Sequence, residues 1–192
     1  MPVRRILADT NVCYPIVLLD LILRLDEVSL HEIVWTEDLL AELSETWVDH
    51  GARSRESADK VCDDIRRTFA GQFVPREEYE HLIEAMPGQD PDDHVHAAAA
   101  AARSPIVIVT NNVRDFPELP LKGYGVGVET PDSYLLQLVD SDIDELCIIV
   151  MEMADDRIRP KMSVDDVLDT LARAGAPSFS ERVRGRLRSQ NA

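Results

Sequence analysis

Short apolar runs that alternate with longer amphipathic stretches are the feature that most restricts the fold of this chain of 192 residues. Residues 106–109 are apolar and β-branched throughout, which is typical of a central parallel strand buried on both faces. Residues 3–8 predict a similar strand, and the remaining extended stretches are shorter: residues 33–35, 72–74 and 124–128. Strands that alternate with helices predict an α/β fold with right-handed crossovers.

Helical periodicity fills the intervals between these strands. The clearest case follows Thr36, a predicted N-cap, where Leu39, Leu43 and Trp47 recur at three- or four-residue spacing. A later helix is predicted to open with Asp90 as its cap and Pro91 at its first position. The predicted helices in this part are residues 14–25, 37–50, 54–69, 77–86 and 91–103.

Only helical patterns remain in the last third of the chain. They cover residues 133–139, 142–158, 164–174 and 178–188, with Pro160, Gly175 and Pro177 as breaks. We therefore predict one α/β domain over residues 1–134 and a helical extension over residues 135–192.

Composition restricts the setting of the protein. Three scattered cysteines indicate a reducing compartment and buried thiols, and no signal peptide or membrane span is predicted, so we expect a cytoplasmic protein. The formal net charge of −16 argues against non-specific coating of nucleic acid, which depends on Lys and Arg. It does not exclude a nuclease whose metal ions supply the local positive charge.

Four acidic residues stand where such a fold would gather them. Asp9 follows the first strand, Glu42 lies on a helix, Asp93 opens an alanine-rich helix, and Asp115 follows the strand at residues 106–109. Ligands of parallel sheets bind beyond the carboxyl ends of the strands. Two carboxylates about 4 Å apart repel by roughly 4 kcal/mol, and Mg²⁺ or Mn²⁺ relieves that repulsion through oxygen ligands. The pattern therefore favours metal-assisted phosphodiester hydrolysis.

Each of these acids also has a purely structural interpretation. Asp9 could cap a turn, and Glu42 could lie on a solvated helix face. Asp93 suits a helix N-terminus, and Asp115 could close a turn with Asn112.

Two histidines follow Asp93 on the same predicted helix. His94 and His96 would point about 200° apart, so we do not expect them to share a metal. We predict one exposed and one packed histidine.

The strings LADTNV, LLAEL, DPDDHVHAAAA and IVIVTNNVRDF resemble PIN-domain ribonucleases, in particular the VapC-like toxins of toxin–antitoxin pairs. The resemblance covers about residues 3–134 and implies a PIN-like three-layer α/β/α sandwich with a parallel sheet, followed here by C-terminal helices. It implies that the catalytic and metal-holding residues are Asp9, Glu42, Asp93 and Asp115. It places beside the ion or substrate Thr10, Asn11, Asp90, Thr110 and Asn112. Some members carry an acid where Asn112 stands, so either Asn112 or Asp115 completes the site.

The resemblance implies a Mg²⁺- or Mn²⁺-dependent endoribonuclease that acts as a toxin, with an RNA substrate, a cognate antitoxin, and often a homodimer. Two alternatives remain. An aspartyl-nucleophile phosphatase would use Asp9, but that chemistry wants a second Asp where this chain has Asn11. A non-catalytic PIN scaffold would bind protein or RNA without cleaving it.

The end of the chain is basic, with four arginines and one acid between residues 177 and 192. Val183 and Leu187 predict a narrow apolar edge beside these arginines. We expect this segment to contact protein, either an antitoxin or a second subunit, more than RNA.

Overall fold

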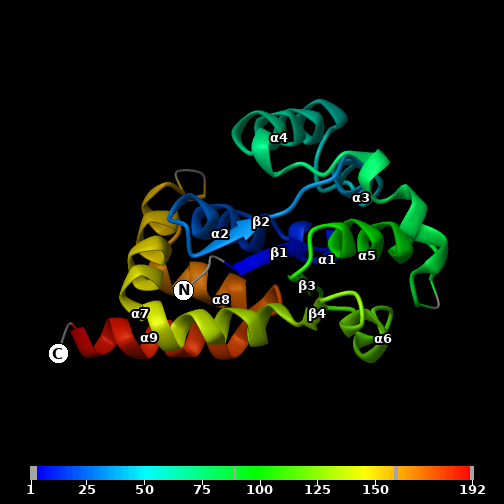
Figure 1. Ribbon diagram of the computed structural model, residues 1–192. Helices are drawn as coiled ribbons and strands as arrows, with labels where there is room; N and C mark the ends of the chain where they lie inside the picture. The colour runs from blue at the N-terminus through cyan, green and yellow to red at the C-terminus, as the bar shows by residue number, and fades with distance from the viewer. Residues whose placement is uncertain (1–3, 89, 158–159, 191–192) are drawn as a thin grey trace.

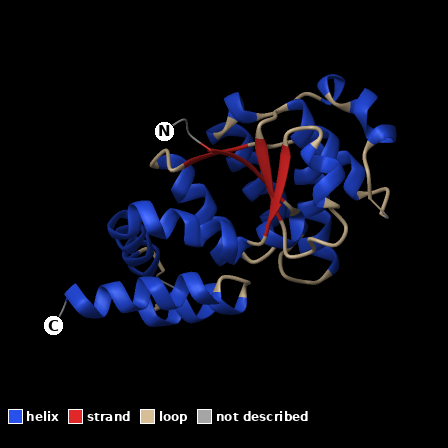
Figure 2. Cartoon of the chain, turned by 60° about the horizontal axis from the view of Figure 1, so that its bottom comes forward, coloured by secondary structure: helices blue, strands red, loops and turns tan. Residues whose placement is uncertain are grey.

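The computed structural model describes residues 4–88, 90–157 and 160–190 (Figure 1). Its centre is a four-stranded sheet in the order β2-β1-β3-β4, with every pair parallel. The strands are β1 (Arg4–Ala8), β2 (His31–Ile33), β3 (Ile106–Val109) and β4 (Val126–Glu129). Figure 2 shows them enclosed by helices, which confirms the predicted α/β fold with a parallel sheet.

The helices occupy the intervals between the strands and the whole C-terminal third of the described chain. They are α1 (Thr10–Cys13), α2 (Ile16–Glu27), α3 (Glu37–Asp49), α4 (Arg55–Thr68), α5 (Asp93–Ala102), α6 (Glu118–Lys122), α7 (Pro131–Asp155), α8 (Val164–Arg173) and α9 (Pro177–Gln190).

Side chains of the central strands alternate between two cores. Ile6 and Val109 pack with apolar residues of α2, α3, α4, α7, α8 and α9 on one face of the sheet. Leu7 and Ile108 pack with α5 and α6 on the other face. The alanines of α5 are almost completely buried there, because small side chains let the helix lie close to the sheet. The result is the predicted three-layer sandwich.

Helix starts follow the local sequence closely. The Thr36 hydroxyl accepts a hydrogen bond from Leu39 N at 3.0 Å, and Ser54 makes the equivalent bond to Ser57 N at 3.2 Å. These caps satisfy backbone donors that a helix leaves without intrahelical partners. Thr36 therefore caps α3, the helix that carries Glu42, as predicted.

Several predicted elements differ in the structure. Residues 72–74 contribute only a single bridge, between Trp35 and Phe73, and not a strand. Residues 77–86 form short 3₁₀ turns, η2 (Arg76–Glu78) and η3 (Glu80–Ala85), in place of an α-helix. The helices predicted at 133–139 and 142–158 are one helix, α7, with a kink at Asp142; Ile158, like Val3 of the first predicted strand, lies outside the described residues.

The C-terminal helices pack on the sandwich and on each other. In Figure 1, α7, α8 and α9 lie together, away from α5 and α6. Phe179 and Val183 of α9 are fully buried in the same core as α2 and α7. The predicted division after residue 134 falls within the first turns of α7 and stays a prediction.

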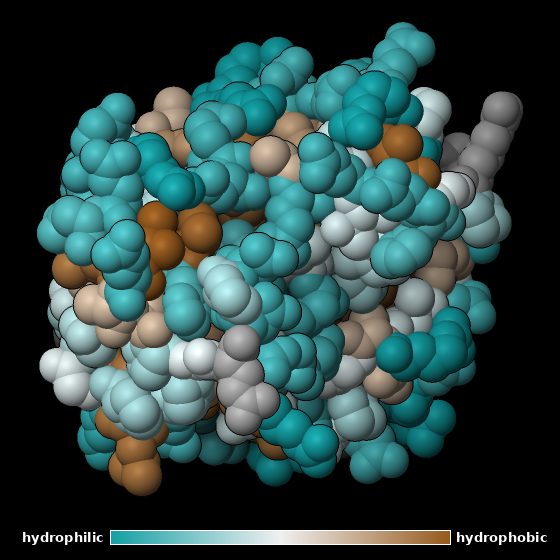
Figure 3. Space-filling model, turned by 90° about the vertical axis from the view of Figure 1, so that its right-hand side faces the viewer, coloured by the Kyte–Doolittle hydropathy of each residue, from teal (hydrophilic) through white to brown (hydrophobic). Residues whose placement is uncertain are grey.

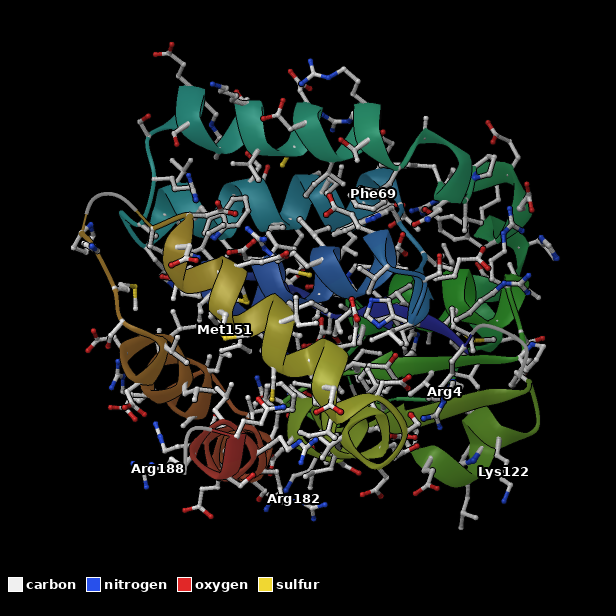
Figure 4. The ribbon with its side chains drawn as sticks, turned by 90° about the vertical axis from the view of Figure 1, so that its left-hand side faces the viewer. Arg4, Phe69, Lys122, Met151, Arg182 and Arg188 are labelled. Carbon is white, nitrogen blue, oxygen red and sulfur yellow. The ribbon has the colours of Figure 1, made fainter. Side chains whose placement is uncertain are left out.

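The prediction that the apolar edge of the tail is a docking surface is wrong. Val183 is buried and Leu187 packs against the core, because α9 turns that edge toward α7 and α8. Three of the arginines pair with acids of the same chain: Arg182 with Asp140, Arg184 with Asp165 and Asp169, and Arg186 with Asp144. Figure 4 shows α9 nearly end-on, with Arg182 and Arg188 projecting from it.

Other features of the chain agree with its composition. Cys13, Cys62 and Cys147 are buried free thiols, as predicted. Within the described ranges, every helix is too short or too polar to cross a lipid bilayer.

Candidate active site

The carboxyl ends of β1 and β3 bring two distant sequence motifs together. Asp9 follows β1, and its backbone N–H donates to Val109 O at 3.0 Å, so the two strands remain paired up to the site. Thr110 follows β3 and donates its hydroxyl to Asp9 Oδ2 at 2.6 Å. Asp9 is only 4% exposed and Thr110 is fully buried. The predicted meeting of these two segments is therefore present.

Three donors hold the Asp9 carboxylate. Besides Thr110, Thr10 N donates to Oδ1 at 2.7 Å, which makes Asp9 the N-cap of α1, and the Asn11 amide donates to Oδ2. Burial nevertheless raises the pKa of Asp9, although the bonds from Thr110 and Thr10 oppose that shift and Glu42 adds to it. Asp9 is thus both a cap and a buried carboxylate whose charge is poorly solvated.

Glu42 reaches the site from α3 and pairs with a histidine of α5. Its Oε2 lies 2.7 Å from His96 Nε2, and the His96 side chain is only 3% exposed while that of Glu42 is 48% exposed. Partial burial favours neutral Glu42, but the bond and charge of His96 outweigh it and lower the pKa of Glu42. The Thr10 hydroxyl lies near enough to contribute to this shift without completing a hydrogen bond.

Asp93 is the first residue of α5 and is half-buried. Its pKa is raised to about 6, first by burial and then by the negative charges of Asp9, Asp90 and Asp115. Because the charges of these three acids act on Asp93, the four carboxylates share one region of the fold. The acids that the sequence singled out are therefore neighbours, and at least Asp9 and Asp93 resist carrying their charges.

The loop after β3 turns back on itself. Asn112 N donates to Thr110 Oγ1 at 2.9 Å, and the Asn112 amide donates to the Asp115 carboxylate. Asn112 and Asp115 thus form one hydrogen-bonded unit, so this geometry does not choose between them as the residue that completes the site.

Asp90 does not cap α5 as expected. Its Oδ1 accepts from Asp92 N at 3.0 Å, in a turn that precedes the helix, and Asp92 occupies the N-cap position. The helix begins two residues later than predicted because Pro91 lies in this turn and not in the helix. Asp90 remains close enough to Asp93 to raise its pKa.

Two residues near the acids were absent from the prediction. One histidine of this helix was expected to be packed, without a choice between His94 and His96, although the position of His96 three residues after Asp93 already placed it on the same side. Asn111 donates its backbone N–H to Asn11 Oδ1 at 2.9 Å, and no sequence pattern indicated that contact. Asn11 thereby links the loops after β1 and β3.

The donor set has the chemistry of a site for a hard divalent cation. Carboxylates and hydroxyls are the ligands such ions prefer, and Thr10 Oγ1 is buried without a hydrogen-bond partner among the described residues. Across residues 4–88, 90–157 and 160–190, however, no three His, Cys, Asp or Glu side chains already stand together as a metal site. Glu42 Oε2 is bonded to His96 and the Asp115 carboxylate to Asn112, so joint binding of one ion would use the other carboxylate oxygen of Glu42 and requires the Asp115 side chain to rotate.

Comparison with known proteins finds two matches to this chain. Residues 131–185 match the family model described as the VapC50 C-terminal domain. The chain is 35% identical over 106 residues to VapC50 of Mycobacterium tuberculosis, which is named as a candidate ribonuclease. That match covers 55% of this chain and 62% of the relative, which is less than two thirds of the relative's length. No solved structure matches this chain significantly. The chain with this parallel sheet and these acids at its carboxyl edge is therefore similar to VapC50, and its last three helices match the model of the VapC50 C-terminal domain.

Proposed function

We propose that this protein is an endoribonuclease that depends on Mg²⁺ or Mn²⁺. The observation that carries the proposal is the meeting of Asp9 and Asp93 at one sheet edge, where burial raises both pKa values and the charge of Asp9 adds to the rise at Asp93. Carboxylates with raised pKa values cluster at functional sites, because structural acids are usually placed where their charge is solvated or paired. The name of the VapC50 relative supports a nuclease.

The residues that would hold the ion are Asp9 and Asp93, with Glu42 through the carboxylate oxygen that His96 does not bind, and Asp115 after rotation of its side chain. A bound divalent cation supplies activation of a water nucleophile, orientation of the scissile phosphate and stabilisation of the leaving oxygen. Asp9 is held ready by Thr110, Thr10 and Asn11, so its orientation costs little entropy when the ion or substrate arrives.

The charge of the protein makes a cation necessary for this activity. A chain of net charge −16 repels RNA, and its carboxyl-edge acids add to that repulsion. Viewed from the right-hand side of Figure 1, the surface is predominantly hydrophilic, with apolar side chains in small separate groups (Figure 3). The site therefore needs the ion to activate the water nucleophile and to offset the repulsion between the carboxylates and the phosphate of RNA.

The phosphatase alternative is less consistent with the geometry. That chemistry needs a second acid two positions after the nucleophile, and Asn11 stands there instead. Its amide donates to the Asp9 carboxylate, which lowers the nucleophilicity of that oxygen.

We also propose, from the similarity of the chain to VapC50, a toxin role in the cytoplasm, a cognate antitoxin and a homodimer.

The test compares wild-type protein with Asp9→Asn on a short RNA, with Mn²⁺ and with EDTA. We expect Asp9→Asn to abolish metal-dependent cleavage while the fold is kept, because it removes one charge from a repelling cluster. Asp92→Asn is the matched control, since Asp92 is exposed and adjacent to Asp93. Wild-type rates in Asp9→Asn would show that the site is wrong. Absence of Mn²⁺ binding would favour the scaffold, and a phosphoenzyme trapped at Asp9 would favour the phosphatase.

The toxin proposal has a separate test. Induced expression followed by sequencing of RNA ends should show new ends that are missing with Asp9→Asn. Co-expression of a small open reading frame found beside the gene should suppress those ends. Unchanged RNA ends would leave a nuclease without a toxin role.

A further inference from the structure

His96 is a buried histidine that the proposed chemistry has not used. It lies on α5 three residues after Asp93, and residues at this spacing face the same side of a helix. Its ring is 3% exposed, and Nε2 lies 2.7 Å from Glu42 Oε2. The other ring nitrogen, Nδ1, is buried and has no hydrogen-bond partner among the described residues.

Packing alone does not account for an imidazole here. Leaving a buried polar atom without a partner costs about 1–3 kcal/mol, which an apolar side chain of similar size would avoid. The bond to Glu42 is the compensation, since hydrogen bonds to charged groups are about twice as strong as neutral ones. Nε2 must be the donor in this bond, because a carboxylate only accepts.

Glu42 needs such a partner to stay in one place. Its side chain is long and about half exposed, and ordering a glutamate side chain costs up to about 1.5–2 kcal/mol of rotamer entropy. Asp9, in contrast, is short and held by three donors. His96 is the group that ties Glu42 to α5, the helix that also carries Asp93.

We propose that His96 is a positioning residue that donates through Nε2 to Glu42 Oε2. This bond holds the other carboxylate oxygen, Oε1, in position for a divalent cation. This inference rests on the proposed function, because it takes Glu42 to be a ligand of the ion. Carboxylates that bind metals are themselves hydrogen-bonded, and loss of such an outer partner typically lowers metal affinity or activity by about 10–100-fold.

The experiment measures Mn²⁺ binding to the full chain by isothermal titration calorimetry, with His96→Leu and His96→Gln as a pair. Leucine keeps the apolar volume and removes the donor, so we expect affinity to fall by about 10–100-fold. Glutamine keeps an N–H donor at the end of its side chain, so we expect it to restore most of the loss. Melting temperatures in EDTA confirm that both variants fold.

The matched control makes the same two substitutions at His94. His94 is on the same helix, but its ring contacts Gly88 O at 3.3 Å and not Glu42, so both variants should bind Mn²⁺ as the wild type does. RNA cleavage adds a second readout. His96→Leu should need more Mn²⁺ to reach half its maximal rate, with little change in the KM for RNA.

The outcomes separate this proposal from the proposed function. If Asp9→Asn abolishes Mn²⁺ binding while His96→Leu binds normally, the metal site stands and the positioning role is wrong. If His96→Gln is as weak as His96→Leu, the donor is not what matters, and the positioning role is equally overturned. If the wild type itself binds no Mn²⁺, both proposals fail.

Discussion

Gly175, in the turn between α8 and α9, packs directly against Asn111, in the loop that follows β3. A Cβ atom at Gly175 would lie 2.6 Å from Asn111 Oδ1 and 3.4 Å from its Cγ and Nδ2. Asn111 N in turn donates to Asn11 Oδ1, and the Asn11 amide donates to Asp9. The C-terminal extension therefore touches the loop that borders the candidate site.

Gly175→Ala tests how much this turn depends on glycine. Its φ of +113° lies where side chains are rarely tolerated, so we expect the free energy of unfolding to fall by about 1–3 kcal/mol in urea titrations. The Asn111 amide can rotate away, but the backbone strain remains. Gly185→Ala is the control with opposite sign: it lies within α9 with nothing within 4 Å of its Cβ, so we expect about 0.5–1 kcal/mol of stabilisation. Equal stability of both variants would contradict this account.

Asp93 should make the metal-free protein less stable as the pH rises. Its folded pKa of about 6 exceeds an unfolded value of about 3.9, so the folded state binds the proton more tightly. The stabilisation is present below about pH 4 and is lost as the pH rises through 6, by about 1–2 kcal/mol after allowance for solvent screening. Asp93→Asn should remove this loss. The measurement is the difference in unfolding free energy between wild type and variant from pH 4 to 8 in EDTA.

The control for that series is Asp92→Asn, an exposed neighbour on the same turn. It should keep the wild-type dependence on pH. A constant difference between wild type and Asp93→Asn across the range would show that Asp93 titrates normally. Added Mn²⁺ should also flatten the wild-type profile, because a cation stabilises the ionised carboxylates.

His31 should remain neutral at pH values well below about 6.5, the usual pKa of a histidine. Its Nε2 lies 2.9 Å from Ile22 O and must donate to that carbonyl, so Nδ1 accepts from the Tyr134 hydroxyl at 2.8 Å. Burial lowers its pKa to about 4, against the opposing effects of Ile22 O and Asp26. Its contribution to stability, about 3 kcal/mol, is present above pH 6.5 and is lost as the pH falls toward 4. In NMR spectra the His31 ring resonances should not move between pH 8 and 5; a midpoint near 6.5 would contradict the prediction.

Phe179 tests whether the extension is part of the core. It is fully buried, and its backbone N–H donates to Asp132 Oδ1 at 2.9 Å, which ties the start of α9 to the first turn of α7. Phe179→Ala should lower the free energy of unfolding by about 3–5 kcal/mol. Ser178→Ala, at an exposed neighbour, should change it by less than about 0.5 kcal/mol. A small effect of Phe179→Ala would indicate an extension that is only loosely attached.

This packing makes the tail part of the core. Truncation after Ala176 removes Phe179 and Val183 from the core, so it cannot isolate a binding function. Substitution of exposed Arg182 tests binding by the tail with less disturbance of the core, because among the described residues its side chain pairs with Asp140, at 3.5 Å.

The local sequence determined those strands and helix starts that depend on residue type and hydrophobic pattern within a few residues. The β-branched run at β3 and the apolar run at β1 specify buried strands, and Thr36 specifies the start of α3. Parallel strands place their carboxyl ends at one edge, so the approach of Asp9 to the loop after β3 also followed from the pattern. Where the pattern was weak, at residues 72–74 and 77–86, the tertiary structure decided, because short stretches take the conformation their neighbours allow.

Contacts between side chains were decided only by the tertiary structure. The sequence predicted one packed histidine on α5, but only the packing of α3 beside α5 shows that it is His96 and places it 2.7 Å from Glu42. The same holds for α9, whose apolar edge could have faced a partner and instead closes the core with α7 and α8. A sequence pattern predicts which face of a helix or strand is buried. It does not predict which surface covers that face, because that depends on how elements far apart in the sequence pack together.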